Sequence, residues 1–488
     1  MASACIVTAA VNHGGLRLAG NKQRSTLKPS RLIAAPAQAV LPLDQHAGAS
    51  ASPRVRVGDR VLRGQLIGQA EGEISASLHA SIAGRVRAIE TRPVPYHRSS
   101  PSLCIVIDND GSDSEATGSI VDYQSLDPRA LCEHIEAGGI VGLGGATFPT
   151  APKLRRGQQA SDVQLILNGA ECEPWISCDD MLMREQADDI LRGAVILCHA
   201  LQAARCTVVI EDDKPDAERS MQAALAKLND ARIAILRVPT IYPAGGENQV
   251  ITAVTGMEVP STGLPSDIGV LCLNVGTAAA IARWLDRGEP LIRRMVTITG
   301  SGVTEAGNLD VWLGTSISDL IGQSGGYTGS LARLLMGGSM MGLALPTDDL
   351  PIVKASNCLV AALPADLHPR GVEMPCIRCG NCSEACPAIL LPQQLYWFAG
   401  SQDFGALEAH GLLDCIECGC CDYVCPSQIP LAQRFRDTKP ALIERLTARE
   451  QALLARERYE SRDARIERIE AERQAKLAEK RKSMTARG

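Results

Sequence analysis

The stretches CIRCGNCSEACP at residues 376–387 and CIECGCCDYVCP at residues 415–426 decide which fold and which chemistry this chain can support. Each follows the pattern C-x2-C-x2-C-x3-C-P, so eight of the 18 cysteines form two groups of three plus one. Two-residue spacers let one loop wrap around a metal centre, and the proline after the fourth cysteine turns the chain away. In a chain whose thiols are kept reduced, such clustering predicts metal ligation rather than disulfides.

The doubled run is the signature of bacterial ferredoxins with two 4Fe–4S clusters, in which the fourth cysteine of each run ligates the other cluster. A cubane cluster takes four thiolates, and the crossed fourth ligand brings the two clusters close enough to exchange electrons. The alternative is a pair of zinc sites, but these use two pairs of ligands rather than three-plus-one runs closed by proline. Cys420 is predicted to be a non-ligand. The predicted ligands are Cys376, Cys379, Cys382 and Cys425 for the first cluster, and Cys415, Cys418, Cys421 and Cys386 for the second.

Composition describes a multidomain globular protein. The chain has 488 residues, of which 45% are hydrophobic and 21% are charged, enough for roughly three or four domains with sizeable cores. The net charge of −6 gives no case for nucleic-acid binding. The longest apolar run, residues 268–282, is shorter than the roughly 18 residues that a membrane span needs. We therefore expect a cytoplasmic protein that docks on a membrane partner.

Patterns along the rest of the chain predict a multidomain α/β and α+β architecture. Short β runs between residues 31 and 110 are similar to lipoyl or biotinyl carrier domains, but the hairpin at 74–81 has no lysine to modify. This indicates a barrel-sandwich scaffold without a prosthetic arm. Farther along, strands alternate with helices, which predicts a mainly parallel, helix-covered sheet. The predicted series is an irregular segment at 1–30, the barrel-sandwich hybrid domain at 31–110, a Rossmann-like domain at 125–290, a β-grasp domain resembling SLBB at 291–350, the two-cluster ferredoxin-like domain at 365–435 and a charged helical tail at 436–488.

A glycine-rich loop, GGIVGLGGATFPTAPK at residues 138–153, opens the Rossmann-like region. Glycines allow a backbone to approach a phosphate closely, and N–H groups at a helix start bind anions, although such a loop also suits a tight turn with a helix cap. Two further stretches follow predicted strands, NGAECEP at 168–174 and YPAGGEN at 242–248. Their polar side chains belong at the carboxyl edge of the sheet, where ligands bind. Together the three stretches predict a nucleotide site.

These three stretches resemble the flavin- and NADH-binding subunit of respiratory complex I. In the order of its parts, the chain from about residue 13 to residue 435 is similar to the C subunit of the Rnf ion-translocating ferredoxin:NAD oxidoreductase family. Leu143, Ala170 and Gly246 depart from the complex I pattern, which has Arg, Asp and Glu there. The implied roles are flavin-phosphate and cofactor-edge contacts for Gly142, Gly144, Gly145 and Lys153, FMN binding for Asn168, catalytic positions facing the flavin and nicotinamide for Glu171 and Glu173, NADH ribose binding for Glu247, and a second flavin-phosphate contact for Asn274 and Thr277.

The resemblance implies a peripheral electron-transfer subunit on the cytoplasmic side of the bacterial inner membrane, without a transmembrane segment. Its cofactors would be FMN and two 4Fe–4S clusters with NADH as substrate, in an oxidoreductase coupled to ion translocation. Expected partners are the membrane and iron–sulfur subunits of an Rnf-type complex, NAD(H) and, indirectly, ferredoxin, but no nucleic acid. Two alternatives stay open: a flavin and iron–sulfur corrinoid reductase, and a flavin-free iron–sulfur wire or scaffold.

Overall fold

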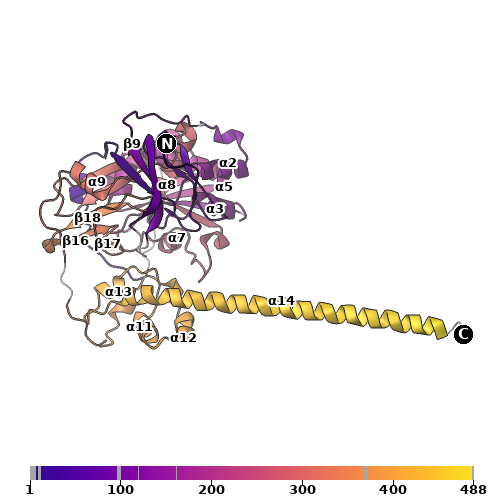
Figure 1. The fold of residues 1–488 in the computed structure, drawn as a ribbon. Helices are drawn as coiled ribbons and strands as arrows, with labels where there is room; N and C mark the ends of the chain where they lie inside the picture. The colour runs from indigo at the N-terminus through magenta and orange to yellow at the C-terminus, as the bar shows by residue number, and fades with distance from the viewer. Residues whose placement is uncertain are drawn as a thin grey trace.

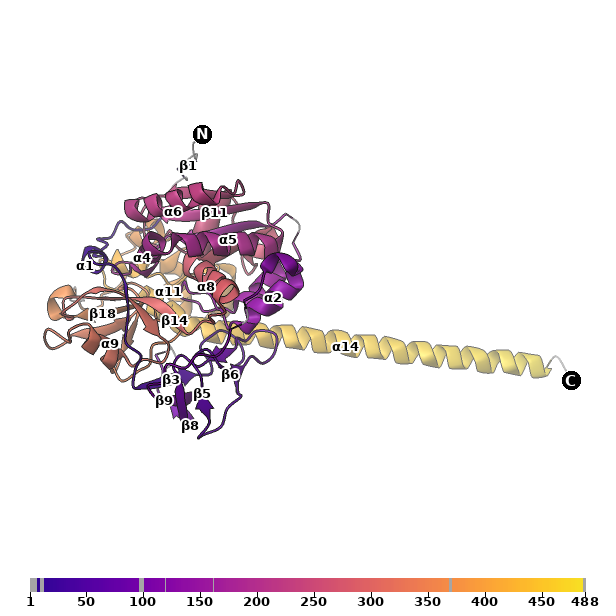
Figure 2. The same cartoon turned by 90° about the horizontal axis from the view of Figure 1, so that it is seen from above.

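Among the residues that the structure describes, the body of the protein holds four β-sheets and their covering helices, and a small cysteine-rich unit lies beside it at the base of one long helix (Figure 1). Viewed from above, the helix-covered sheet of the Rossmann-like region lies next to the barrel-sandwich region and the SLBB-like region (Figure 2). This computed structural model describes residues 7–8, 13–95, 101–118, 120–160, 162–367 and 371–485.

The Rossmann-like region is built on a parallel sheet of order β1-β12-β11-β10-β13. Strands β10 to β13 are mostly apolar and buried, as parallel strands covered on both faces require. All strand pairs of this sheet are parallel, as the alternation of strands and helices in the sequence predicts. The residue ranges are Val7–Thr8 for β1, Gln164–Gly169 for β10, Arg205–Glu211 for β11, Ile233–Val238 for β12 and Val270–Asn274 for β13.

Seven helices cover this sheet or lead into it within the described residues. In the first of them, Asp127 caps the helix by accepting a hydrogen bond from the N–H of Ala130, and Pro128 takes the first helical position. The ranges are Pro128–Ala137 for α2, Thr150–Gly157 for α3, Cys178–Glu185 for α4, Ala187–Leu201 for α5, Pro215–Leu228 for α6, Glu247–Thr255 for α7 and Val275–Arg287 for α8.

The barrel-sandwich region has two small antiparallel sheets, of order β3-β9-β8-β5 and β4-β6-β7. Their alternating side chains bury an aliphatic core that includes Leu41, Ile67 and Ile105. The ranges are Gln38–Pro42 for β3, Ser52–Pro53 for β4, Arg60–Val61 for β5, Leu66–Gln69 for β6, Leu78–His79 for β7, Gly84–Arg92 for β8 and Ser102–Asn109 for β9.

The SLBB-like region is a mixed sheet of order β17-β16-β18-β14-β15-β2. Two of its strands lie outside the predicted range of 291–350, because β18 follows that range and β2 comes from the start of the chain. A short helix, α1 (Gln23–Thr26), also forms within the segment predicted to be irregular. The ranges are Arg31–Leu32 for β2, Arg293–Thr299 for β14, Gly307–Trp312 for β15, Ile317–Gln323 for α9, Arg333–Met336 for β16, Leu343–Leu345 for β17 and Cys358–Ala362 for β18.

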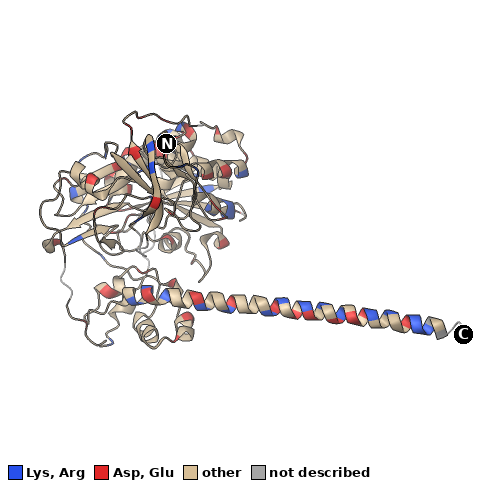
Figure 3. Ribbon diagram, viewed as in Figure 1, with Lys and Arg blue, Asp and Glu red and all other residues tan. Residues whose placement is uncertain are grey.

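The cysteine-rich unit consists of short helices around a core of Leu395, Leu407, Leu412 and Phe435. Its last helix, α14 (Leu431–Thr485), continues into the charged tail, whose surface mixes both signs of charge (Figure 3). Within the described residues, no helix is long and apolar enough to cross a membrane. The other ranges are Asn381–Glu384 for α10, Pro392–Ser401 for α11, Phe404–Ala409 for α12 and Cys420–Tyr423 for α13.

Candidate functional site

The glycine-rich loop lies against the first turn of α8. Its Leu143 is held from both sides, because its N–H donates to the Thr277 hydroxyl (3.0 Å) and its carbonyl accepts from the Arg294 guanidinium (3.1 Å). A Cβ atom at Gly144 would lie 3.4 Å from Cβ of Asn274, while Gly145 has a φ of 125° and open space around it. The structure therefore brings Gly144, Asn274 and Thr277 together, as the predicted phosphate site requires. Arg294, which comes from β14 of the SLBB-like sheet, was not anticipated.

Two asparagine side chains lie at the carboxyl ends of neighbouring parallel strands. Asn168 and Asn274 are register partners of β10 and β13. The amide nitrogen of Asn168 donates to the Gly245 carbonyl (2.9 Å), and that of Asn274 donates to a carboxylate oxygen of Asp179 (2.6 Å). The end of β10 is thus tied to the loop before α7, and this edge of the sheet carries several polar groups in one place.

Lys153 and Glu247 form an ion pair at this edge, although their predicted roles concern different nucleotides. The Lys153 ammonium donates to a Glu247 carboxylate oxygen (2.6 Å) and to the Cys272 carbonyl (2.6 Å). Both side chains are partly exposed. A cation expected at the flavin and an acid expected at the NADH ribose therefore lie within one small area.

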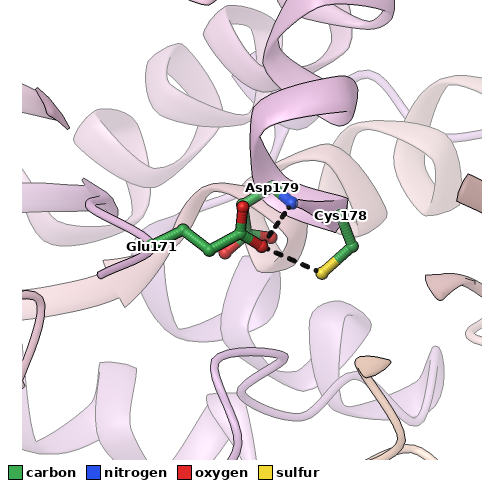
Figure 4. Close-up of side chains that lie close together, drawn as sticks. All are labelled: Glu171, Cys178 and Asp179. Carbon is green, nitrogen blue, oxygen red and sulfur yellow. Dashed lines mark hydrogen bonds between the residues drawn. The ribbon is translucent and has the colours of Figure 1, made fainter. Parts of the chain in front are cut away.

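Glu171 lies buried at the N-terminus of α4 (Figure 4). Its carboxylate accepts hydrogen bonds from the N–H groups of Asp179 (2.9 Å) and Asp180 (3.3 Å) and from the Cys178 thiol (3.3 Å). Burial, together with the nearby Asp179 carboxylate, raises the pKa of Glu171 to about 7. The group can therefore change charge near neutral pH, which suits an acid placed beside a redox site.

A second buried acid at the same edge was missed in the sequence. Glu211 ends β11, accepts a hydrogen bond from the N–H of Glu171 (3.1 Å) and pairs with the buried ammonium of Lys214. The carboxylates of Glu211 and Asp213 raise the pKa of Lys214 against the opposing effect of its burial, so the lysine stays charged. The signal was available, because the run EDDK directly follows an apolar strand.

Glu173 turns away from Glu171 and toward the SLBB-like sheet. Its Oε1 accepts hydrogen bonds from the backbone N–H groups of Met340 (3.2 Å) and Met341 (2.7 Å), in the turn between β16 and β17. Its Oε2 is buried without a hydrogen-bond partner among the described residues. Burial raises the pKa of this carboxyl to about 7 as well. The catalytic role expected for Glu171 and Glu173 stays a prediction.

The eight motif cysteines surround two separate cavities. Each cavity gathers three cysteines of one run and the fourth cysteine of the other run, which is the crossed arrangement that the doubled pattern predicts. One is lined by Cys376, Cys379, Cys382 and Cys425, and the other by Cys386, Cys415, Cys418 and Cys421, with Cys420 at its side.

Tyr242 joins the second cavity to the Rossmann-like region. Its buried hydroxyl donates to the Cys418 carbonyl (2.6 Å), and its own carbonyl accepts from the Cys420 thiol (3.9 Å between sulfur and oxygen). The Cys420 thiol also interacts with the thiol of Cys418, one of the four proposed ligands, so its place outside the ligand set stays a prediction. On the other side, the N–H of Gly15 donates to the Ala385 carbonyl (3.0 Å).

Four family models match the chain in the order that the fold shows. They are the RnfC barrel sandwich hybrid domain at residues 11–112, the Nuo51 FMN-binding domain at 135–283, the SLBB domain at 295–344 and the 4Fe-4S dicluster domain at 375–429. Several similar curated proteins are named as the C subunit of an ion-translocating oxidoreductase complex. The one from Pseudomonas aeruginosa is 46% identical over 91% of this chain and 57% of its own length. The chain belongs to the RnfC family.

Other RnfC relatives give the same result. The proteins from Pectobacterium carotovorum and Pectobacterium atrosepticum are 44% and 43% identical, over 87% and 91% of this chain and over 57% and 64% of their own lengths. The chain thus spans little more than half the length of these relatives. A crystal structure of an NAD+-reducing [NiFe]-hydrogenase aligns with a TM-score of 0.47 and 17% identity, over 64% of this chain and 61% of that one, too weakly to support an inference.

These matches confirm several predictions made from the sequence. The RnfC resemblance, the four-part fold class and the FMN and 4Fe–4S cofactors are all confirmed. The domain boundaries and the roles of individual site residues stay predictions.

Proposed function

We propose that this chain carries electrons between NADH, FMN and two 4Fe–4S clusters as the peripheral subunit of an ion-translocating oxidoreductase complex. The observation that carries the proposal is the hydrogen bond from Tyr242 to the Cys418 carbonyl, which joins the FMN-binding domain directly to a cluster loop. A route for electrons needs such contact between the two cofactor sites. RnfC relatives of the same name support the assignment to a complex of this kind.

The residues at the two cysteine cavities fit 4Fe–4S clusters. Each cavity offers four sulfur atoms from two runs. Such clusters supply one-electron chemistry when bound. The chain's own contribution is to bury them to different extents: Cys386, Cys418 and Cys421 are buried, whereas Cys379 in the other set is exposed. The second set is therefore the one shielded by the body of the protein.

The residues at the carboxyl edge of the parallel sheet fit FMN. The glycines of the loop allow close approach of a phosphate, the Lys153 ammonium supplies positive charge, and the Asn168 amide comes from the same edge of the sheet. A bound flavin supplies the ability to take two electrons and release them singly. Glu247, at the first position of α7, is the carboxylate that we assign to the ribose of NADH.

Burial of the two cysteine sets supports an order of electron flow. The set with Cys418 adjoins the FMN-binding domain through Tyr242 and the N-terminal segment through Gly15. The set with Cys379 opens to the surface next to the exposed side chain of Ile377. We therefore assign the inner set to exchange with the flavin and the outer set to exchange with another subunit of the complex.

The expected partners follow from this assignment. They are NAD(H), the membrane and iron–sulfur subunits of an Rnf-type complex and, through them, ferredoxin. The chain would work on the cytoplasmic side of the inner membrane. Its net charge of −6 gives no support for nucleic-acid binding.

Anaerobic purification followed by cofactor counting and NADH reduction tests the function. We expect about eight irons, eight sulfides and one FMN per chain, with bleaching of both flavin and iron–sulfur absorbance on addition of NADH. Zinc in place of iron would refute the cluster assignment. Iron–sulfur absorbance without flavin would favour the wire or scaffold, and flavin that NADH does not reduce would remove NADH as the substrate.

A further inference from the structure

The turn between β16 and β17, residues 337–342, encloses the carboxylate of Glu173. One carboxylate oxygen accepts hydrogen bonds from two consecutive backbone N–H groups of the turn, those of Met340 (3.2 Å) and Met341 (2.7 Å). Two donors from adjacent residues fix both the position and the direction of the turn relative to the FMN-binding domain.

Glycines make this close approach feasible. A Cβ atom at Gly338 would lie 2.3 Å from the carboxyl carbon of Glu173, and one at Gly342 would lie 2.1 Å from the Gly338 carbonyl oxygen. Neither position can carry a side chain without moving the turn or the carboxylate. The sequence of the turn is therefore matched to an acid that comes from another domain.

The opposite side of the same turn rests on the loop of the inner cysteine set. The Met340 carbonyl oxygen and Cε lie 3.8 Å and 3.9 Å from the position that a Cβ atom of Gly419 would occupy. Met340 also packs with Tyr242, Cys418 and Cys420 in one small apolar cluster. The turn thus has Glu173 on one side and the cluster loop on the other.

We propose that Glu173 is a positioning residue that seats the SLBB turn on the loop of the inner cysteine set. The SLBB domain then helps to set how this cluster site is placed relative to the flavin site. The inference rests on the proposed function, because it concerns the transfer of electrons between those two sites. The SLBB domain thereby has a part in electron transfer. This part follows only when the turn and the carboxylate are considered together.

The burial of Glu173 argues against a purely packing role. An apolar side chain could fill the same space without the cost of burying a carboxylate that has one oxygen unpartnered among the described residues. The carboxylate accepts hydrogen bonds from two N–H groups in defined directions, which an apolar side chain cannot do.

Four variants of the full-length chain test the proposal, each purified anaerobically and checked for iron and flavin content. In Glu173→Ala the acceptor is lost, while Glu173→Gln retains an oxygen that can accept from the turn. Gly338→Ala pushes the turn off the carboxylate without changing any residue of the predicted flavin site. Glu258→Ala changes an exposed acid of the FMN-binding domain and serves as the control.

The readouts are the rate at which NADH reduces the flavin, the rate at which electrons then reach the clusters, and the electron paramagnetic resonance spectrum of the inner cluster. We expect Glu173→Ala and Gly338→Ala to slow cluster reduction about tenfold and to alter the inner-cluster spectrum, whereas Glu173→Gln stays within about threefold of the wild type. Gly338→Ala should leave the flavin step unchanged. Should Gly338→Ala not fold, Met340→Ala replaces it, with a smaller effect of the same kind.

Three outcomes would overturn the proposal. The first is a wild-type spectrum and transfer rate in both Glu173→Ala and Gly338→Ala. The second is equal damage by Glu173→Gln and Glu173→Ala, confined to the flavin step, which would place the acid at the flavin. The third is the same loss in the Glu258→Ala control. If the wild type itself is not reduced by NADH, the proposed function fails, and the inference that depends on it fails with it.

Discussion

Replacing Tyr242 with phenylalanine removes the hydroxyl that joins the FMN-binding domain to the loop of the inner cysteine set. The ring stays in place, and only the donor to the Cys418 carbonyl, 2.6 Å away, is lost. The residue is buried, with 2% of its surface exposed, so water does not readily take the place of the hydroxyl. Tyr242→Phe is therefore a minimal test of the contact on which the proposed electron route depends.

The expected size of the effect follows from this burial. Leaving a buried carbonyl without its donor costs about 1–3 kcal/mol. If about 1 kcal/mol of this differs between the oxidised and reduced states of the cluster site, the one-electron potential shifts by about 40 mV. The shift is toward lower potential, because the variant removes the positive end of an O–H dipole at the Cys418 carbonyl, and Cys418 is a proposed ligand of the cluster that gains negative charge on reduction.

Potentiometric titration of the clusters followed by electron paramagnetic resonance measures that shift. Hydrogen exchange in residues 415–421 reports how firmly the loop is held. The matched control is Tyr423→Phe, since Tyr423 is 61% exposed in the same unit. Equal potentials in both variants, together with unchanged exchange in the loop, would refute the view that Tyr242 couples the two sites.

Three further predictions concern the cysteines, the glycine loop and the buried acid. Cys420→Ser should keep about eight irons per chain while Cys421→Ser keeps about four, and equal iron losses in the two variants would contradict the ligand assignment. Gly139→Ala places a Cβ atom 2.4 Å from the Ser77 carbonyl oxygen, so it should lower the free energy of unfolding by about 2–4 kcal/mol and reduce flavin content. Its control is Gly58→Ala, which shares a positive φ but has open space, and which should lower the free energy of unfolding by about 1 kcal/mol. With the pKa of Glu171 raised from 4.5 to about 7, the folded chain holds a proton that the unfolded chain releases between these values. Glu171 should therefore contribute a fall in stability of up to about 3 kcal/mol as pH rises through this window, and Glu173, whose pKa is also raised to about 7, should add to the fall. Glu171→Gln should reduce the slope without abolishing it, and an unchanged slope by denaturant titration would show that Glu171 does not titrate there.

Local patterns in the sequence predicted the cysteine cavities and the parallel strands. Ligand spacing in the runs at 376–387 and 415–426 determines which sulfur atoms can meet, and that information lies within a few residues. The strands were predictable because buried parallel strands are short apolar runs between helices. Most side chains at the carboxyl edge of the sheet were found for the same reason, since polar residues that follow a strand collect there.

Contacts between domains could not be predicted from such patterns. Arg294 donates to the Leu143 carbonyl across two domains, although nothing about its position in β14 marks it as part of a flavin loop. Lys354 is buried and donates to the carbonyls of Ser77 (3.1 Å) and Gly139 (2.7 Å), joining three regions at one ammonium. Burial lowers the pKa of this lysine to about 7. Each contact joins residues far apart in the chain, and only the folded arrangement determines which of them meet.

Helix α14 extends the molecule without adding to its route for electrons. Its side chains from residue 447 to residue 482 are exposed, and the Arg449–Glu408 ion pair (2.7 Å) lies close to the point where the helix leaves the body. At 1.5 Å per residue, about 50 Å of helix stands clear of the protein. None of the predicted cofactor-binding residues lies on this helix, so it would take no part in electron transfer. A partner bound at its far end would be held at a distance from the body and would be separated from electron transfer in the rest of the chain.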